Sequence, residues 1–95
     1  MKKILIYGAG AIGRGFIPWV FPPTEFELYY VESNSRIREL LNKQKKFLTF
    51  KTMEGKYEKL EVPIVHCYNS GEEIDIIGNM DAIIISVGPR NALSL

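Results

Sequence analysis

The chain has 95 residues, 46% of them hydrophobic and 24% charged, and a formal net charge of +1. This composition is typical of a single globular domain and excludes a disordered or fibrous chain, while the small net charge excludes a long-range attraction to nucleic acid or to an anionic membrane. With one cysteine, Cys67, the chain has no internal disulfide, which favours a reducing compartment, and we expect a cytoplasmic protein.

The first strand and the turn after it carry the strongest signal in the chain. Residues 3–7 are apolar without alternation, as in a parallel strand covered on both faces, and Gly8, Gly10 and Gly13 then follow in the spacing G-x-G-x-x-G. In that motif the first glycine makes a tight turn, the second lets the backbone approach a pyrophosphate, and the third lets the helix pack closely. Glycines also mark ordinary turns. Here a strand precedes the motif, a helix follows it, and Glu32 comes 19 residues after Gly13, which together favour a dinucleotide site.

Residues 11–20 are predicted to form the first helix. Pro18 lacks the N–H that would bond to the carbonyl of Arg14, so we expect a kink or a loosened turn there. Pro22 and Pro23 then end the helix. The predicted apolar face of this helix consists of Ile12, Phe16, Ile17 and Val20.

Residues 27–32 are rich in β-formers and predict a second strand that ends in Glu32. Ser33 or Asn34 is expected to cap the next helix. Arg36 is the residue that could instead neutralise a 2′-phosphate, and we interpret it as an exposed residue of the first turn. The buried stripe of this helix is predicted to be Ile37, Leu40 and Leu41.

Residues 47–53 and 57–62 alternate apolar and polar side chains around Glu54-Gly55-Lys56, which predicts a β-hairpin. A plain doubly wound unit has no hairpin at this place. We therefore interpret it as an insertion that lies along or near the sheet edge and has one solvated face.

The last third of the chain predicts two more parallel strands. Residues 63–66 are assigned to the third strand, residues 72–77 to a short helix capped by Ser70, and residues 81–87 to the fourth strand. Right-handed crossovers then give the strand order 3-2-1-4, a partial Rossmann-type doubly wound α/β sheet. Residues 86–90 should face a cofactor at the carboxyl ends of the strands, although an ordinary strand-ending turn also explains them.

Three stretches together carry a resemblance to a known family. They are Y-G-A-G-A-I-G-R-G-F-I at residues 7–17, Glu32 followed by Asn34, and S-V-G-P at residues 86–89. With them the chain resembles the N-terminal NAD-binding domain of the mannitol-1-phosphate 5-dehydrogenases. The resemblance implies an NAD-dependent oxidoreductase that converts a polyol phosphate, of the type mannitol 1-phosphate to fructose 6-phosphate. It also implies that the substrate and the catalytic residues belong to a second, C-terminal domain, so we expect residues 1–95 to be the N-terminal piece of a longer chain.

The expected site holds NAD and contains no catalytic residue, because the resemblance places those residues in the C-terminal domain. No metal is expected, and His66 has no Ser, Cys or carboxylate at the spacing of a triad or a metal site. A polyol phosphate is the expected small-molecule partner, and we expect no nucleic-acid or membrane partner. Two alternatives stay open: another Rossmann dehydrogenase, acting on a 2-hydroxy acid or a UDP-sugar, and a stand-alone nucleotide-sensing module. The predicted contacts are Gly8, Gly10, Gly13 and the N–H groups of Ala11 and Ile12 with the pyrophosphate, Glu32 with the adenosine ribose, and Ser86, Gly88 and Asn91 with the nicotinamide side.

Overall fold

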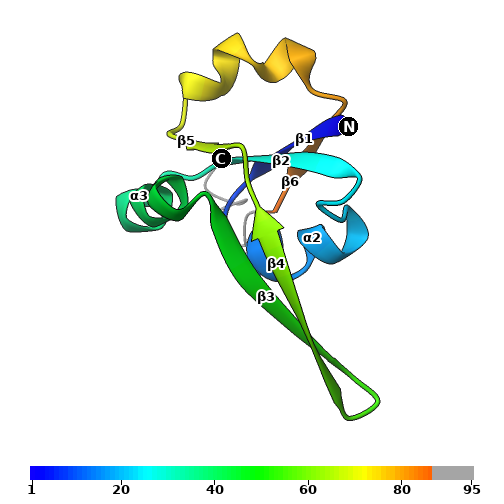
Figure 1. Ribbon diagram of the computed structural model, residues 1–95. Helices are drawn as coiled ribbons and strands as arrows, with labels where there is room; N and C mark the ends of the chain where they lie inside the picture. The colour runs from blue at the N-terminus through cyan, green and yellow to red at the C-terminus, as the bar shows by residue number, and fades with distance from the viewer. Residues whose placement is uncertain (87–95) are drawn as a thin grey trace.

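Four parallel strands form the main sheet of the computed structural model, which describes residues 1–86 (Figure 1). Across the sheet their order is β5-β2-β1-β6. Counted along the chain, this is the order 3-2-1-4, so the sequence prediction of a partial Rossmann-type α/β sheet is confirmed. The strands are β1 (Lys2–Tyr7), β2 (Phe26–Val31), β5 (His66–Tyr68) and β6 (Ala82–Ile85).

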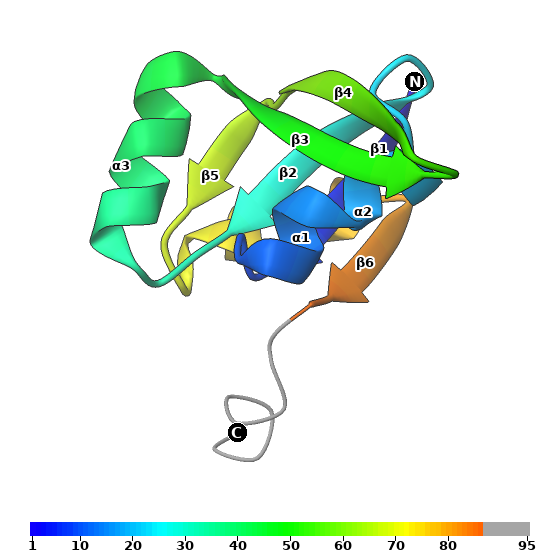
Figure 2. The ribbon, with the colours of Figure 1, turned by 90° about the horizontal axis from the view of Figure 1, so that it is seen from below.

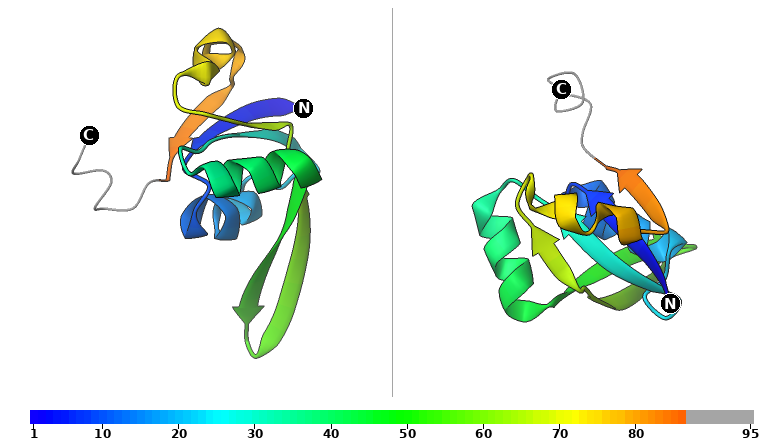
Figure 3. Two further views of the ribbon diagram at one scale, coloured as in Figure 1. Left: turned by 90° about the vertical axis from the view of Figure 1, so that its left-hand side faces the viewer. Right: turned by 90° about the horizontal axis from the view of Figure 1, so that it is seen from above.

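The two faces of the sheet are covered by different elements (Figures 2 and 3). Helices α1 (Ala11–Gly15), α2 (Ile17–Val20) and α3 (Ser35–Gln44) lie on one face. Two 3-10 turns, η1 (Glu72–Asp75) and η2 (Ile77–Asn79), lie on the other. Because side chains alternate along a strand, β1 and β2 each supply residues to both layers of the core. Within residues 1–86, no helix is long and apolar enough to cross a membrane.

The first helix is two helices, α1 and α2, with Phe16 between them. Pro18 explains the break, because its missing N–H belongs best in the first turn of a helix, and it occupies that position at the start of α2. The predicted apolar face is wrong for most of its members: Ile17 is buried, whereas Ile12, Phe16 and Val20 are about half exposed. The break at Phe16 interrupts the continuous helix that a single apolar stripe would require.

The predicted hairpin is confirmed, as β3 (Lys46–Met53) paired antiparallel with β4 (Lys56–Pro63). Its turn is Glu54-Gly55, where both residues have positive φ, 52° and 74°, as a two-residue type I′ turn requires. The base of the hairpin packs on the helix-covered face of the sheet rather than along its edge, since Phe47 contacts the ring of Tyr30. Its tip projects away from the sheet (Figure 3).

Three local predictions around α3 and β5 need correction. The third strand begins at His66, because residues 66–68 are the ones that pair with β2, while Pro63 ends β4. The helix expected at residues 72–77 is the pair of 3-10 turns, and Gly71 rather than Ser70 precedes the first of them. In α3, Asn34 is the N-cap and Leu41 is buried, but Leu40 is half exposed.

Candidate functional site

The glycine turn joins the carboxyl end of β1 to α1. Gly8 has φ of +100°, a conformation that side-chain-bearing residues rarely adopt, and its N–H donates to the carbonyl of Val31 at 2.8 Å. A Cβ on Gly13 would stand 2.0 Å from the carbonyl oxygen of Gly8, so only glycine lets α1 pack this closely on the turn. The first and third glycines of the motif therefore have the structural roles that the sequence predicted.

Gly10 differs from its two neighbours in the motif because it faces open space. A Cβ added there would meet no atom of residues 1–86 within 4 Å. Within the same residues, the N–H groups of Gly10, Ala11 and Ile12 donate no hydrogen bond. Unpaired N–H groups beside an open backbone surface fit an anionic group such as a pyrophosphate.

Glu32 directly follows β2 and lies against the glycine turn. Its Oε1 accepts a hydrogen bond from the N–H of Ala9 at 2.8 Å, and its Oε2 accepts one from the N–H of Asn34 at 2.8 Å. A carboxylate oxygen can accept two hydrogen bonds, so each oxygen retains capacity for a ribose hydroxyl. The structure therefore brings together the two parts of the motif that are 19 residues apart in the sequence.

Ser86 follows β6 and packs against the same turn. It is buried, and its Oγ lies 3.0 Å from the carbonyl oxygen of Tyr7 and 2.8 Å from that of Gly8. The hydroxyl thus contacts the protein backbone, and its predicted contact with the nicotinamide stays a prediction. Gly88 and Asn91 lie outside the described residues.

Three polar side chains that the sequence analysis did not assign to the site hold its backbone. Arg14 donates from Nε to the carbonyl of Ala9 at 2.5 Å, and the buried Tyr30 hydroxyl donates to the carbonyl of Gly13 at 2.7 Å. Arg38 donates to the carbonyl of Glu32 at 2.9 Å. The only sequence signal for any of these was the G-R-G-F continuation of the glycine motif, which contains Arg14.

Two further titratable groups lie near the site and take no part in it. Burial raises the pKa of the Cys67 thiol to about 11, which keeps it protonated and unreactive at neutral pH. Burial, followed by the hydrogen bond to Glu73, raises the pKa of Tyr7. The Tyr7 hydroxyl donates to Glu73 at 3.0 Å and so fastens η1 to the end of β1.

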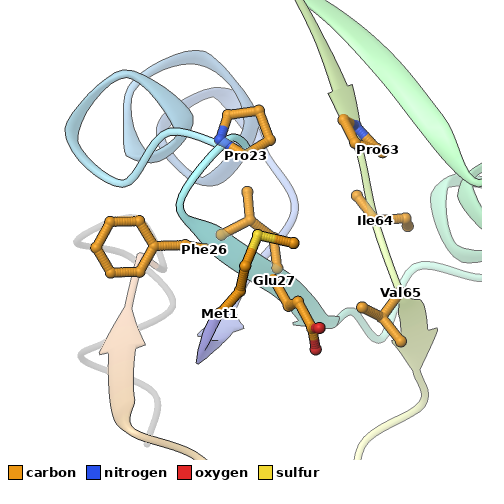
Figure 4. Close-up of a pocket in the computed structure, with 8 residues that line it drawn as sticks. Met1, Pro23, Phe26, Glu27, Pro63, Ile64 and Val65 are labelled. Carbon is orange, nitrogen blue, oxygen red and sulfur yellow. The ribbon is translucent and has the colours of Figure 1, made fainter.

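A shallow pocket of about 280 Å³ lies at the opposite end of the sheet, where β1 and β2 begin (Figure 4). Its lining is apolar apart from Glu27. Ligands of open parallel sheets bind at the carboxyl ends of the strands, so the glycine turn and not this pocket is the candidate site. The pocket residues are Met1, Pro23, Phe26, Glu27, Leu28, Pro63, Ile64 and Val65.

The strand order, the glycine turn and the strand-end carboxylate define a nucleotide-binding domain of the Rossmann type. Comparison with known proteins gives its family: the mannitol dehydrogenase Rossmann domain matches residues 2–95, and the chain belongs to that family. The family resemblance that the three sequence stretches carry is therefore confirmed.

Curated relatives agree with this family. A mannitol-1-phosphate 5-dehydrogenase from Lactococcus lactis subsp. cremoris (strain MG1363) is 34% identical over 94 residues, which cover 95% of this chain and 24% of the relative. The mannitol-1-phosphate 5-dehydrogenases of Caldanaerobacter subterraneus subsp. tengcongensis and Streptococcus pneumoniae (strain JJA) are each 33% identical to this chain, and the matched residues cover 25% of each relative. The chain spans about a quarter of the length of the curated relatives it matches.

Proposed function

We propose that this chain is the NAD-binding portion of a polyol-phosphate dehydrogenase of the type that oxidises mannitol 1-phosphate to fructose 6-phosphate. The observation that carries the proposal is the open backbone at Gly10 beside the strand-end carboxylate of Glu32. The names of the relatives support the polyol phosphate as substrate class, in preference to a 2-hydroxy acid or a UDP-sugar. A cytoplasmic location fits the free, buried thiol of Cys67.

In this proposal the glycine turn binds the pyrophosphate through the N–H groups of Gly10, Ala11 and Ile12. Glu32 accepts hydrogen bonds from the adenosine ribose, and its charge repels a 2′-phosphate, so NAD is favoured over NADP. Arg36, the residue that would favour NADP, is exposed in the first turn of α3. When bound, NAD supplies the hydride acceptor, and the protein supplies binding and orientation.

The substrate pocket and the catalytic residues belong, in this proposal, to the remaining three quarters of the relatives' length. A general base would have to stand beside the nicotinamide and the substrate carbinol, and the resemblance to the family places that group in the C-terminal domain. We therefore expect the 95-residue chain to bind NADH and to have no dehydrogenase activity of its own.

Calorimetric titration with NADH and NADPH, and an assay of NADH formation from mannitol 1-phosphate and NAD, test the proposal together. The expected result is NADH binding that is tighter than NADPH binding, with no turnover. Failure to bind either dinucleotide would overturn the proposed cofactor site. Turnover by this chain would show that the catalytic groups had been assigned to the wrong part of the protein.

A further inference from the structure

Both polar backbone groups of Ala9 are bound by charged side chains from different elements. The N–H of Ala9 donates to Oε1 of Glu32 at 2.8 Å, and its carbonyl oxygen accepts from Nε of Arg14 at 2.5 Å. Ala9 is fully buried, so each group needs an internal partner if the turn is to avoid the cost of an unpaired donor or acceptor. Here the donor meets an anion and the acceptor meets a cation, which makes both hydrogen bonds stronger than neutral ones.

The two contacts fix the two peptide groups on either side of Ala9. Glu32 holds the peptide that joins Gly8 to Ala9, and Arg14 holds the peptide that joins Ala9 to Gly10. In a trans peptide the carbonyl and the N–H point in opposite directions. Holding the Ala9 carbonyl on Arg14 therefore turns the N–H of Gly10 away from the guanidinium and toward the other side of the turn.

Glu32 is itself held in place from the side of α3. Its second oxygen accepts from the N–H of Asn34, and Arg38 donates to the backbone carbonyls of Glu32 and Ser33 at 2.9 and 3.2 Å. The carboxylate that meets Ala9 is therefore positioned by the start of α3, whereas the guanidinium that meets Ala9 comes from α1. Ala9 is the point at which the turns that follow β1 and β2 are joined.

We propose that Glu32 and Arg14 form a clamp on Ala9 that holds the glycine turn in its dinucleotide-binding conformation. The clamp rests on the proposed function, and it adds a role for Arg14, a positioning residue that acts through Ala9 without touching the cofactor. A turn held in its bound conformation loses less conformational freedom on binding. Release of the Arg14 contact should therefore weaken binding of NAD and of NADP by the same factor.

The clamp is tested first without any ligand, by amide exchange and NMR of the purified chain. In Glu32→Ala the amide of Ala9 should exchange at least about ten-fold faster, because its acceptor is gone, while the amide of Ile6 in the neighbouring strand reports that the fold is intact. In Arg14→Leu the nitrogen resonance of Gly10 should shift, because the carbonyl of the same peptide has lost its donor. Unchanged Ala9 exchange and an unchanged Gly10 resonance would overturn the clamp, whether or not the chain binds a dinucleotide.

Titration with NADH and NADPH then tests what the clamp does for binding. Arg14→Leu should weaken both about ten-fold, the equivalent of about 1.4 kcal/mol. Arg14→Lys, which keeps a cationic donor, should recover part of the loss, and Lys43→Leu, which removes an exposed cation from α3, should lose nothing. The double variant Glu32→Ala with Arg14→Leu should lose less than the product of the two single losses, because both act on one turn.

Unchanged affinity in Arg14→Leu, or strictly multiplicative losses in the double variant, would overturn the clamp and leave the proposed cofactor site standing. Absence of dinucleotide binding by the unmodified chain would instead overturn the proposed function. In that case the exchange and resonance measurements alone decide whether the clamp exists.

Discussion

The carbonyl oxygen of Gly8 occupies the space in which a side chain of Gly13 would have to stand. A Cβ built on Gly13 is 2.0 Å from that oxygen and 2.9 Å from the hydroxyl oxygen of Ser86. The first helix, the first strand and the last described strand thus meet at one point where no methyl group fits. Gly10, two residues after Gly8, has open space instead, and this contrast separates the part of the motif that packs from the part that faces a ligand.

Gly13→Ala and Gly10→Ala should therefore fail in different ways. Gly13→Ala should lower the free energy of unfolding by about 1 to 3 kcal/mol or more, because the backbone must move to relieve the overlap. Gly10→Ala should keep its stability, since φ at Gly10 is −84° and the added methyl meets nothing, but should lose NADH binding because the methyl takes the space of the pyrophosphate. Thermal melts and calorimetric titrations of both variants separate the two effects. Full NADH affinity in Gly10→Ala would show that no pyrophosphate approaches this residue.

The hydroxyl of Tyr30 should contribute to stability through the carbonyl of Gly13. The hydroxyl is buried and donates at 2.7 Å, so Tyr30→Phe leaves a buried carbonyl without its partner, at a cost of about 1 to 3 kcal/mol in the free energy of unfolding. The ring and its packing on Phe47 are retained in the variant. Tyr57→Phe is the matched control, because the hydroxyl of Tyr57 belongs to a largely exposed residue of the hairpin. Urea unfolding of the two variants makes the comparison, and equal stabilities would contradict the prediction.

His66 should make the chain less stable as the pH falls. Desolvation, and then the nearby charge of Lys45, lower the pKa of His66 below its ordinary value of about 6.5, although Glu72 acts in the opposite direction. Nζ of Lys45 lies 2.8 Å from Nδ1 of His66, an arrangement that requires the neutral ring as acceptor. Because the unfolded chain binds the proton more readily, the stability from the neutral ring is complete above a pH of about 6.5 and is lost as the pH falls through the folded-state pKa.

The measurement is the melting temperature of the unmodified chain and of His66→Gln at a pH of about 7.5 and of about 5.5, on either side of the ordinary histidine pKa. The melting temperature of the unmodified chain should fall further between the higher and the lower pH than that of the variant, since glutamine does not titrate. A variant that loses as much would show that the pKa of His66 is the same in the folded and the unfolded chain.

The strands of the sheet and the core of the site could be read from the sequence because they depend on local patterns. A buried parallel strand requires an apolar run, such as the one before Gly8. A dinucleotide site also requires a phosphate-binding turn and a carboxylate at the end of the second strand, and both can be recognised in the sequence. The hairpin likewise follows from alternation around Glu54-Gly55. Each of these features can be predicted without knowing where the rest of the chain lies in the fold.

The features that were missed depend on partners far away in the sequence. The third strand begins at His66, because that residue pairs with Tyr29. The sequence of residues 62–68 does not by itself show where the strand begins. The role of Arg14 depends on its reach back to Ala9, and that of Tyr30 on the approach of Gly13. The spacing of apolar residues predicts a buried Phe16 on one continuous helix, whereas Phe16 is the N-cap of a second helix, α2, with Pro18 in its first turn.

The last prediction concerns the preference for NAD over NADP, which the ratio of the NADH affinity to the NADPH affinity measures. Glu32→Ser should weaken NADH binding by about 10-fold or more, because it removes a charge-assisted hydrogen bond worth roughly 1.5 to 3 kcal/mol. It also removes the acceptor of the Ala9 N–H, and that loss is common to both dinucleotides. The ratio of NADH to NADPH affinity therefore reports the interactions at the adenosine ribose and its 2′-phosphate without this shared loss. It should fall in Glu32→Ser, because the repulsion of a 2′-phosphate disappears and the exposed Arg36 can approach the phosphate. In Glu32→Ser with Arg36→Ala the ratio should recover in part.

An unchanged ratio in Glu32→Ser would place the ribose away from this carboxylate, and equal affinities in the unmodified chain would exclude Glu32 as the residue that selects NAD.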